Sequence, residues 1–314
     1  MTLTDAIGFV KDAAERSMPG GVPALYVFHG GFVHARSAAV VAAHPVDLDG
    51  TFALPADDLD AALARLGDDP IIDAGDGTMI LKKGRLRSQL KVLEAEVPVV
   101  FAAPEWQGVP PTLMKALELV APFASDEGTW QRGVHLADGR AAAINNRSAA
   151  ESPVADLPDM DAILGDGAAR YLPTLPEPSG WAVAANSISF GWPNGAWVRC
   201  QLVNASWPAI ADRVMVSAGD EAPITLTEEW REAIDHLSAL GDGAIRVMPQ
   251  GLKAARSHSD AKVKFDTSAT KSTTWAADLL KQIAGVATAW NPDAEGPARF
   301  IGEGLRGVVM RRRG

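Results

Sequence analysis

The stretch Pro55–Lys91, PADDLDAALARLGDDPIIDAGDGTMILKKGRLRSQLK, contains a helical pattern followed by strand patterns. Pro55 fits the first turn of a helix, and Gly67 fits the position after its last residue. The acidic residues Asp57 and Asp58 complement the positive end of the helix dipole. An amphipathic helix is predicted because apolar side chains recur on one face: Leu59, Leu63 and Leu66.

The rest of this stretch alternates short β-prone runs with turn residues. The runs are Ile71–Asp73, Met79–Leu81 and Arg85–Lys91, and Gly75-Asp76-Gly77 and Lys82-Lys83-Gly84 separate them. Glycine-containing turns between such runs are typical of antiparallel hairpins. One folding unit is therefore a helix followed by a small antiparallel sheet.

Helical patterns recur along the whole chain with a period of roughly 50 residues, which indicates an internal repeat. The predicted helices are Leu3–Arg16, Pro55–Leu66, Pro111–Ala121, Pro158–Leu164, a helix that begins at the capping box Thr225-x-x-Glu228 and closes at Gly241, and Thr274–Ala284. Further predicted strands are Ala24–Phe28, Val33–Ala35, Ala38–Ala42, Trp181–Ala184, Ser187–Trp192 and Trp197–Val203. The unit is thus repeated six times.

A single helix on a small sheet leaves much apolar surface uncovered, so two units must pair to bury a helix pair against two sheets. This pairing predicts an α+β fold of three repeated domains, at residues 1–106, 107–206 and 207–314. A chain of 314 residues also exceeds what one hydrophobic core usually serves. The length of the chain and its internal repeat therefore both indicate more than one domain.

Composition indicates a soluble protein of the cytoplasm. No apolar run approaches the ~20 residues that cross a bilayer, and the N-terminal segment lacks the basic start of a signal peptide. The single cysteine, Cys200, has no disulfide partner within the chain. The net charge of −10 argues against a nucleic-acid partner at first, but residues 207–314 are neutral and an acidic exterior can coexist with a local basic face.

Several segments resemble the bacterial and phage DNA sliding-clamp family, the β subunit of DNA polymerase III, over nearly the full length. The entry to the second helix, Gly50–Leu63, is similar to the family's first domain. Phe123–Leu136 followed by Ala143–Asn146, and then Ser187–Pro208, are similar to its second domain. Gly307–Met310 resembles its C-terminal strand. The resemblance implies a DNA clamp fold in a head-to-tail homodimeric ring, without enzymatic activity or cofactor.

Three departures favour a phage-type member. The chain is shorter than a typical bacterial member, Ile144 stands where Thr is usual, and the tail Met310–Gly314 is basic where the family usually has proline and an apolar end.

No constellation of nucleophile, base and orienting group stands out, and the histidines are scattered singly without a zinc-binding spacing. The sequence therefore predicts a protein that is not an enzyme and needs neither cofactor nor metal. An enzyme whose site comes from residues distant in sequence remains an alternative.

In a clamp the helices line the pore, so basic groups on them would contact the DNA backbone without reading sequence. The candidate residues for double-stranded DNA come from five predicted helices and one basic turn: Lys11, Arg16, Arg65, Lys82, Lys83, Arg85, Lys115, Arg231 and Lys281. Solvated helix faces would show the same composition, so this alternative stays open.

The family's second site is an apolar cleft between domains two and three that accepts short peptides from the polymerase and the clamp loader. By resemblance its walls are Ile144, Ala149, Val216, Val308, Val309 and Met310. A methionine in such a groove adapts to varied peptides. The alternative is that Val308 and Val309 merely finish a sheet.

The competing function is that of a β-rich phage structural protein of the virion, without a role in encircling DNA. The repeat of a basic amphipathic helix every ~50 residues favours the clamp. The sequence does not identify the polymerase, the loader or the host.

Overall fold

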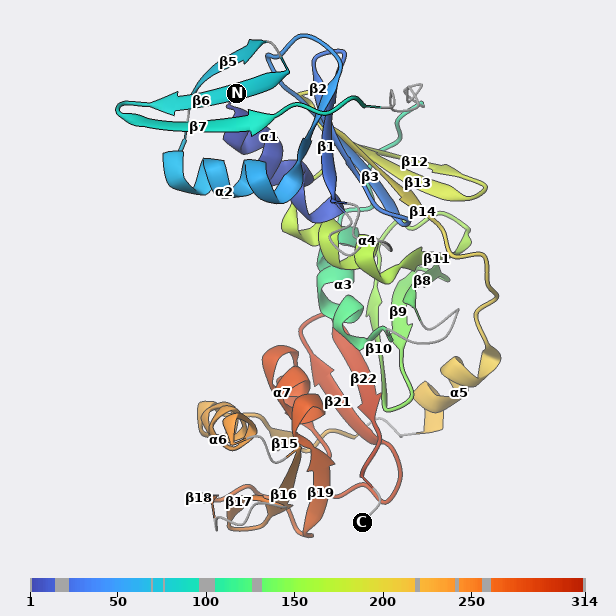
Figure 1. Cartoon of the computed structure of the whole chain (residues 1–314). Coiled ribbons are helices and arrows are strands. Elements are labelled where there is room, and N and C mark those ends of the chain that lie inside the picture. The colour runs from blue at the N-terminus through green and yellow to red at the C-terminus, as the bar shows by residue number, and fades with distance from the viewer. Residues whose placement is uncertain are drawn as a thin grey trace. The chain divides into compact units, whose positions relative to one another are not determined.

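The computed structural model describes residues 2–14, 23–68, 70–75, 77–95, 105–125, 132–217, 221–240, 243–255 and 261–312. Its contacts divide the chain into two compact units. Unit 1 contains Met1–Val109 and Tyr171–Leu202, and unit 2 contains Pro110–Arg170 and Val203–Gly314. Each unit therefore combines segments that lie far apart in sequence, as the colours of Figure 1 show.

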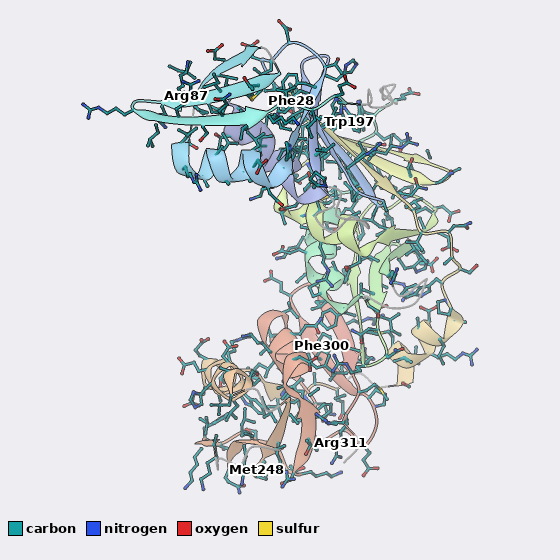
Figure 2. The ribbon with its side chains drawn as sticks, viewed as in Figure 1. Phe28, Arg87, Trp197, Met248, Phe300 and Arg311 are labelled. Atoms are coloured by element: carbon teal, nitrogen blue, oxygen red, sulfur yellow. The ribbon has the colours of Figure 1, made fainter. Side chains whose placement is uncertain are left out.

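Unit 1 is built on a seven-stranded antiparallel sheet with the order β12-β13-β14-β3-β2-β1-β4. Its strands are β1 (Leu25–His29), β2 (Phe32–Arg36), β3 (Val40–Pro45), β4 (Phe52–Pro55), β12 (Gly180–Ala184), β13 (Ser187–Gly191) and β14 (Trp197–Gln201). The pairing of β14 with β3, in which Val198 lies opposite Ala42, joins the two sequence segments of the unit. Apolar side chains at alternate positions, such as Tyr26 and Phe28, are fully buried in the core against this sheet. Figure 2 labels Phe28.

Helix α1 (Leu3–Val10) packs on β2 and β3, and α2 (Ala56–Leu66) packs on β4, β6 and β7. Thr2 caps α1, because its hydroxyl accepts a hydrogen bond from the Asp5 amide at 3.0 Å while the Asp5 carboxylate accepts one from the Thr2 amide at 3.1 Å. These bonds hold the pKa of Asp5 below its ordinary value. A three-stranded sheet follows α2, with β5 (Ile71–Gly75), β6 (Thr78–Lys83) and β7 (Leu86–Lys91) in that order.

Unit 2 holds an eight-stranded antiparallel sheet with the order β11-β8-β9-β10-β22-β21-β20-β15. Its strands are β8 (Gly133–Ala137), β9 (Arg140–Ile144), β10 (Ser148–Pro153), β11 (Asp161–Gly165), β15 (Ile224–Thr225), β20 (Ala289–Trp290), β21 (Ala298–Gly302) and β22 (Leu305–Val309). Helix α3 (Leu113–Val120) packs on β9, β10 and β22. The Phe123 and Phe300 rings stack at 5.3 Å between centroids and fill the core under this sheet.

A second sheet of unit 2 has the order β18-β17-β16-β19. Its strands are β16 (Ala244–Met248), β17 (Gly251–Ala254), β18 (Lys262–Lys264) and β19 (Thr273–Ala276). Helices α6 (Glu228–Ala239) and α7 (Ala277–Val286) pack on each other and on this sheet. Trp230, Trp275 and Trp290 meet edge to face there, with centroid separations of 5.6 and 5.3 Å to Trp290. These large buried rings supply much of the apolar area of this core.

The expected elements agree with the structure at α2, α3 and the hairpins. Helix α1 begins at Leu3 as expected but ends at Val10, before the expected end at Arg16. Four further places differ. The predicted helix Pro158–Leu164 is wrong, because 161–165 is strand β11 and helix α4 is Asp166–Tyr171. The capping box at Thr225 is also wrong, since Thr225 lies in β15 and Thr227 is the residue before α6. Helix α7 begins three residues later than expected, after β19. Helix α5 (Ala209–Ser217) was not expected at all.

The strand-to-helix junctions explain the first and third of these four differences. In both β11–α4 and β19–α7 the last strand residue is followed directly by the helix, without a loop. A short apolar run therefore belongs to the strand although its composition also suits a helix, because periodicity alone does not separate the two.

Gly307 provides a test of the packing in the eight-stranded sheet. A methyl group added there would meet the Phe300 ring and would lie 2.6 Å from the Ala149 carbonyl oxygen. We expect Gly307→Ala to lower the free energy of unfolding by about 1–3 kcal/mol through overpacking, measured by denaturant unfolding. The control is Gly285→Ala in α7, where no atom lies within 4 Å and helix propensity predicts a gain of about 0.5–1 kcal/mol. Equal behaviour of the two variants would contradict this account.

Candidate functional site

Three of the six expected cleft residues lie together on one face of the eight-stranded sheet. Ile144 is on β9, Ala149 on β10 and Val308 on β22, and Ala149 pairs directly with both of the others. They form one buried apolar cluster, with exposures of 6%, 2% and 0%. The pairing of β10 with β22 brings residues 148–151 beside residues 306–309, so this cluster exists only in the folded chain.

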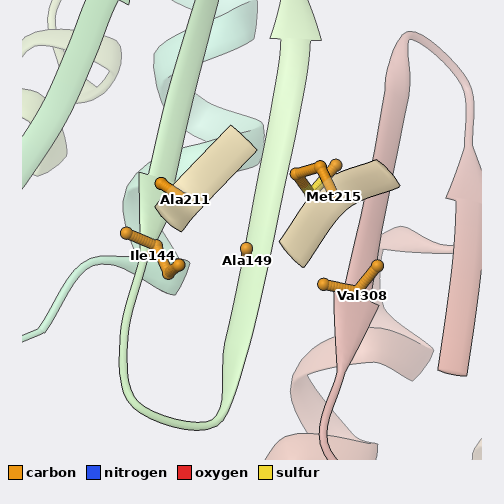
Figure 3. Close-up of a cluster of buried hydrophobic side chains, with 5 residues drawn as sticks. All are labelled: Ile144, Ala149, Ala211, Met215 and Val308. Atoms are coloured by element: carbon orange, nitrogen blue, oxygen red, sulfur yellow. The ribbon is translucent and has the colours of Figure 1, made fainter. Parts of the chain in front are cut away.

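Helix α5 covers this cluster with its own side chains. Ala211 and Met215 are 2% and 7% exposed and belong to the same cluster, while Trp207 and Val214 pack against it. Figure 3 shows Ala211 beside Ile144 and Met215 beside Val308, as α5 crosses the strands. Residues four apart share a helix face, so Ala211 and Met215 point to the same side. The apolar spacing in Ala209–Ser217 is a sequence signal for α5. It was not among the predicted helices because it falls outside their regular spacing.

Trp207 anchors the start of α5. Its ring stacks on His135 of β8 at 4.6 Å between centroids with an interplanar angle of 12°. His135 is buried, and its Nε2 lies 2.8 Å from Asp161 Oδ1 on the neighbouring strand β11. The paired strands therefore fix the position of the Trp207 ring.

Two arginines hold α5 against the sheet. Arg140 on β9 donates from Nη2 to Asp212 Oδ1 at 2.7 Å. Arg299 on β21 donates from Nη2 to the carbonyl oxygen of Met215 at 2.5 Å and is 4% exposed. A cation at the last turn of a helix also complements the negative end of the helix dipole. Sequence reasoning did not identify either residue, because neither lies in a motif.

Glu151 connects Arg140 to a further arginine. Its carboxylate is 4% exposed and accepts a bond from Arg140 Nη1 at 2.5 Å and another from Arg306 Nε. Burial lowers the pKa of Arg140, but the bonds to Glu151 and Asp212 outweigh it, and the pKa is raised. A hollow of 480 Å³ lies beside this network and is lined partly by Arg140, Glu151 and Arg306.

The other expected cleft residues are not members of the buried cluster. Val309 is fully buried, but it alternates with Val308 along β22 and so faces the opposite side of the sheet. Val216 is 79% exposed and Met310 is 42% exposed. The Met310 amide donates to the Arg147 carbonyl at 2.7 Å, which fixes the backbone at the end of β22.

Three of the basic residues expected on the helices have partners within the chain, namely Lys115, Arg231 and Lys281. Lys115 Nζ lies 2.9 Å from Glu118 on α3, and Lys281 Nζ lies 3.0 Å from Asp235, which joins α7 to α6. Arg231 donates to the Ala287 carbonyl at 2.8 Å. All four groups of the two ion pairs are more than half exposed, so solvent screens them strongly. Each pair lowers the local positive potential without preventing the lysine from contacting a phosphate.

The basic residues of the first segment are arranged differently. Lys82 Nζ lies 3.3 Å from Asp73, and Lys83 Nζ donates to the Asp68 carbonyl. Arg85 is exposed in the turn between β6 and β7, and Lys11 is exposed after the end of α1. Arg16 lies outside the described residues.

Arg65 takes part in a cationic hollow that sequence reasoning only partly anticipated. The hollow of 390 Å³ lies between α2 and β7, and Arg65, Arg87 and Lys91 line it together with Asp58. Figure 2 labels Arg87 on β7. Arg87 and Lys91 belong to the dense basic run after Lys82, but their proximity to Arg65 depends on the packing of α2 against β7.

In the described parts of the chain, no group of three or more His, Cys, Asp or Glu side chains that could hold a metal ion occurs. Cys200 is buried, and burial raises the pKa of its thiol, which opposes formation of a thiolate. Among the same residues, none of the helices is long and apolar enough to cross a membrane.

The two compact units, with their antiparallel sheets and covering helices, have the fold of the bacterial DNA sliding clamps. The sliding clamp of Pseudomonas aeruginosa, DNA polymerase III subunit beta, solved bound to griselimycin, is similar with a TM-score of 0.73 and 17% identity, covering 100% of this chain and 98% of the other. The Caulobacter crescentus polymerase III beta structure has a TM-score of 0.70 and 17% identity, with coverage of 100% and 99%. The α+β clamp fold expected from the sequence is therefore confirmed.

A third similar structure is the Helicobacter pylori beta clamp bound to a DNA ligase peptide. It has a TM-score of 0.67 and 12% identity, and the match covers 99% of this chain and 98% of the other. No protein-family model matches the sequence. No curated protein matches it either. The likeness thus lies in the fold, over the full length of both chains.

Glu151 tests the polar network beside the cleft. Glu151→Gln leaves Arg140 and Arg306 without their buried anion, so we expect the free energy of unfolding to fall by about 2–4 kcal/mol. Thermal or denaturant unfolding of the whole chain measures this loss. Glu118→Gln is the matched control, since the exposed pair with Lys115 contributes less than about 1 kcal/mol. A loss no larger than that of the control would show that Glu151 does not stabilise the sheet.

Proposed function

We propose that this protein is a DNA sliding clamp, a processivity factor that encircles duplex DNA and tethers a replicative polymerase. The observation that carries this proposal is that sliding-clamp structures cover the whole chain, and the chain covers 98–99% of each of them. The fold points to a non-enzymatic role in DNA replication. The setting expected from the sequence is the cytoplasm of a bacterium or of a phage-infected host.

The ring is proposed to form from two copies, each with domains at residues 1–106, 107–206 and 207–314. In the described parts of the two small sheets, β7 and β18 are end strands whose outer edges are not covered by a neighbouring strand of the sheet. Open strand edges of this kind support a head-to-tail contact between two copies, and such a heterologous contact closes into a ring when the rotation permits.

Contact with DNA is proposed for Lys11, Arg16, Arg65, Lys82, Lys83, Arg85, Lys115, Arg231 and Lys281. Exposed lysines already paired with carboxylates, such as Lys115 and Lys281, give weak contacts that depend on salt. Weak, sequence-independent attraction suits a ring that must slide, because retention then comes from topology.

Partner binding is proposed at the cleft of Ile144, Ala149, Val216, Val308, Val309 and Met310, with the polymerase and the clamp loader as sources of the peptide. The structures bound to griselimycin and to a DNA ligase peptide support the use of such motifs by proteins of this fold. Exposed Val216 and Met310 supply apolar surface at the edge of the buried cluster.

Retention on circular DNA tests the clamp proposal. Protein monomers are mixed with nicked circular DNA at low concentration and then concentrated, so that rings close around it. We expect the protein to stay on the circles through a high-salt wash and to leave after linearisation, because salt weakens charge contacts but does not open a closed ring. Native mass spectrometry is expected to show a dimer. Equal loss from circular and linear DNA would reject a ring.

Met310→Ala tests the peptide site. Removal of a partly exposed apolar side chain is expected to weaken binding of the Helicobacter pylori DNA ligase peptide by about 1–2 kcal/mol, or about 5- to 30-fold. Fluorescence anisotropy with the labelled peptide measures the change, and the dimer is expected to persist. Arg311→Ala, an exposed neighbour, is the control and is expected to have little effect. Unchanged affinity in Met310→Ala would place the site elsewhere.

A further inference from the structure

We propose that helix α5 is a displaceable internal ligand of the cleft, and that a partner peptide binds by replacing its side chains on the sheet. The inference rests on the proposed function in one respect, namely that peptides bind at this cleft. It adds that the cleft is closed in the free protein and that opening it is a regulated step.

The first support is the occupancy of the cleft floor. Ile144, Ala149 and Val308 are 6%, 2% and 0% exposed while Ala211 and Met215 lie on them. A ligand side chain therefore reaches this floor only where Met215 or Ala211 leaves it. The flexible, unbranched Met215 side chain suits a position that is filled by different groups in turn.

The second support is the character of α5 itself. It has nine residues, which is shorter than the ~12–15 residues that form a stable helix alone. Its helical state thus depends on its contacts with the sheet. Two large apolar side chains also remain on its outer side, Ile210 at 53% exposure and Val216 at 79%. Because α5 has apolar side chains on both sides, it can pack against another apolar surface as well as against this sheet.

The third support is that the ion pair between Arg140 and Asp212 of α5 can break without leaving either charge buried and unpaired. The pair of Arg140 with Asp212 spans 2.7 Å, and Asp212 is half exposed, so its carboxylate regains water when the helix leaves. Arg140 keeps its bond to Glu151, which is held in turn by Arg306. Breaking this ion pair therefore avoids the large cost of a buried, unpaired ion.

The released floor also defines the ligand chemistry. Apolar side chains would fill the places of Ala211 and Met215, and an acidic or carbonyl oxygen would take the place of the Asp212 carboxylate at Arg140. The guanidinium of Arg299, which donates to the Met215 carbonyl, would donate instead to a backbone carbonyl of the ligand. A short apolar peptide with one acidic group fits this arrangement.

A closed cleft lowers the apparent affinity by the fraction of molecules that are open. If α5 must leave the cleft, a change that loosens α5 should strengthen peptide binding. If α5 is instead a permanent part of the peptide site, the same change should weaken peptide binding or leave it unchanged. Asp212→Asn removes the charge pair with Arg140 and leaves the apolar contacts of α5 in place. Arg213→Gln is the matched control, because it changes the next residue of the same helix, which is exposed.

The experiment uses the full chain, with its dimer verified by native mass spectrometry, and two probes: griselimycin and the Helicobacter pylori DNA ligase peptide. Titration calorimetry is expected to show about two- to fivefold tighter binding to Asp212→Asn than to the wild type, and no change in Arg213→Gln. Hydrogen exchange of residues 209–217 is expected to accelerate when a probe saturates the wild type.

Two results would overturn the displacement of α5. Unchanged or weaker binding to Asp212→Asn, with slower exchange of residues 209–217 in the complex, would make α5 a fixed wall of an intact peptide site. Failure of both probes to bind either protein would reject the peptide site as well. The clamp proposal is judged separately by retention on circular DNA.

Discussion

The antiparallel pairing of β10 with β22 is the contact on which unit 2 and its candidate site depend. It places Ser148–Glu151 opposite Arg306–Val309, although roughly half of the chain separates these segments. The pairing lets Ala149 and Val308 share one face, and it brings Arg306 to the carboxylate of Glu151. Gly307 permits it, because any larger residue would meet Phe300 and the Ala149 carbonyl. The backbone hydrogen bonds, the core packing and the cleft therefore all depend on the register between β10 and β22. A slip by one residue would turn Val308 to the opposite face of the sheet.

Several basic side chains of this chain are paired with neighbouring acidic or carbonyl groups. Exposed lysines on α3 and α7 lie beside carboxylates, and Arg231 is bonded to a carbonyl group. The cationic hollow between α2 and β7 contains Asp58 as well as three basic side chains. With a net charge of −10, strong attraction to DNA from the whole surface is not expected. The proposed ring would tolerate this balance, because topological retention needs only weak contacts with the DNA backbone.

The floor of the proposed cleft is covered by a helix of the same chain. An exposed floor of Ile144, Ala149 and Val308 would be an apolar patch open to unspecific association. Helix α5 covers that floor with side chains of its own and is attached by Arg140 and Arg299. The outer groups Val216 and Met310 remain available for a first contact. In the displacement proposed above, the covered and the open cleft are two states of one short helix.

Sequence periodicity alone determined the repeat, the positions of α1, α2 and α3, most hairpins and the α+β class, because amphipathic spacing and turn residues act over a few neighbouring residues. Strand runs that lead directly into helices, as at β11–α4 and β19–α7, were not separable by that signal. The resemblance to sliding clamps indicated Ile144, Ala149 and Val308, which the fold brings together. Only the tertiary structure decided that Val309 faces the other side, that α5 covers the cleft, and that Arg140, Glu151, Arg299 and Arg306 surround it. These facts depend on strand pairing between distant segments, and no local pattern in the chain encodes which strands become neighbours.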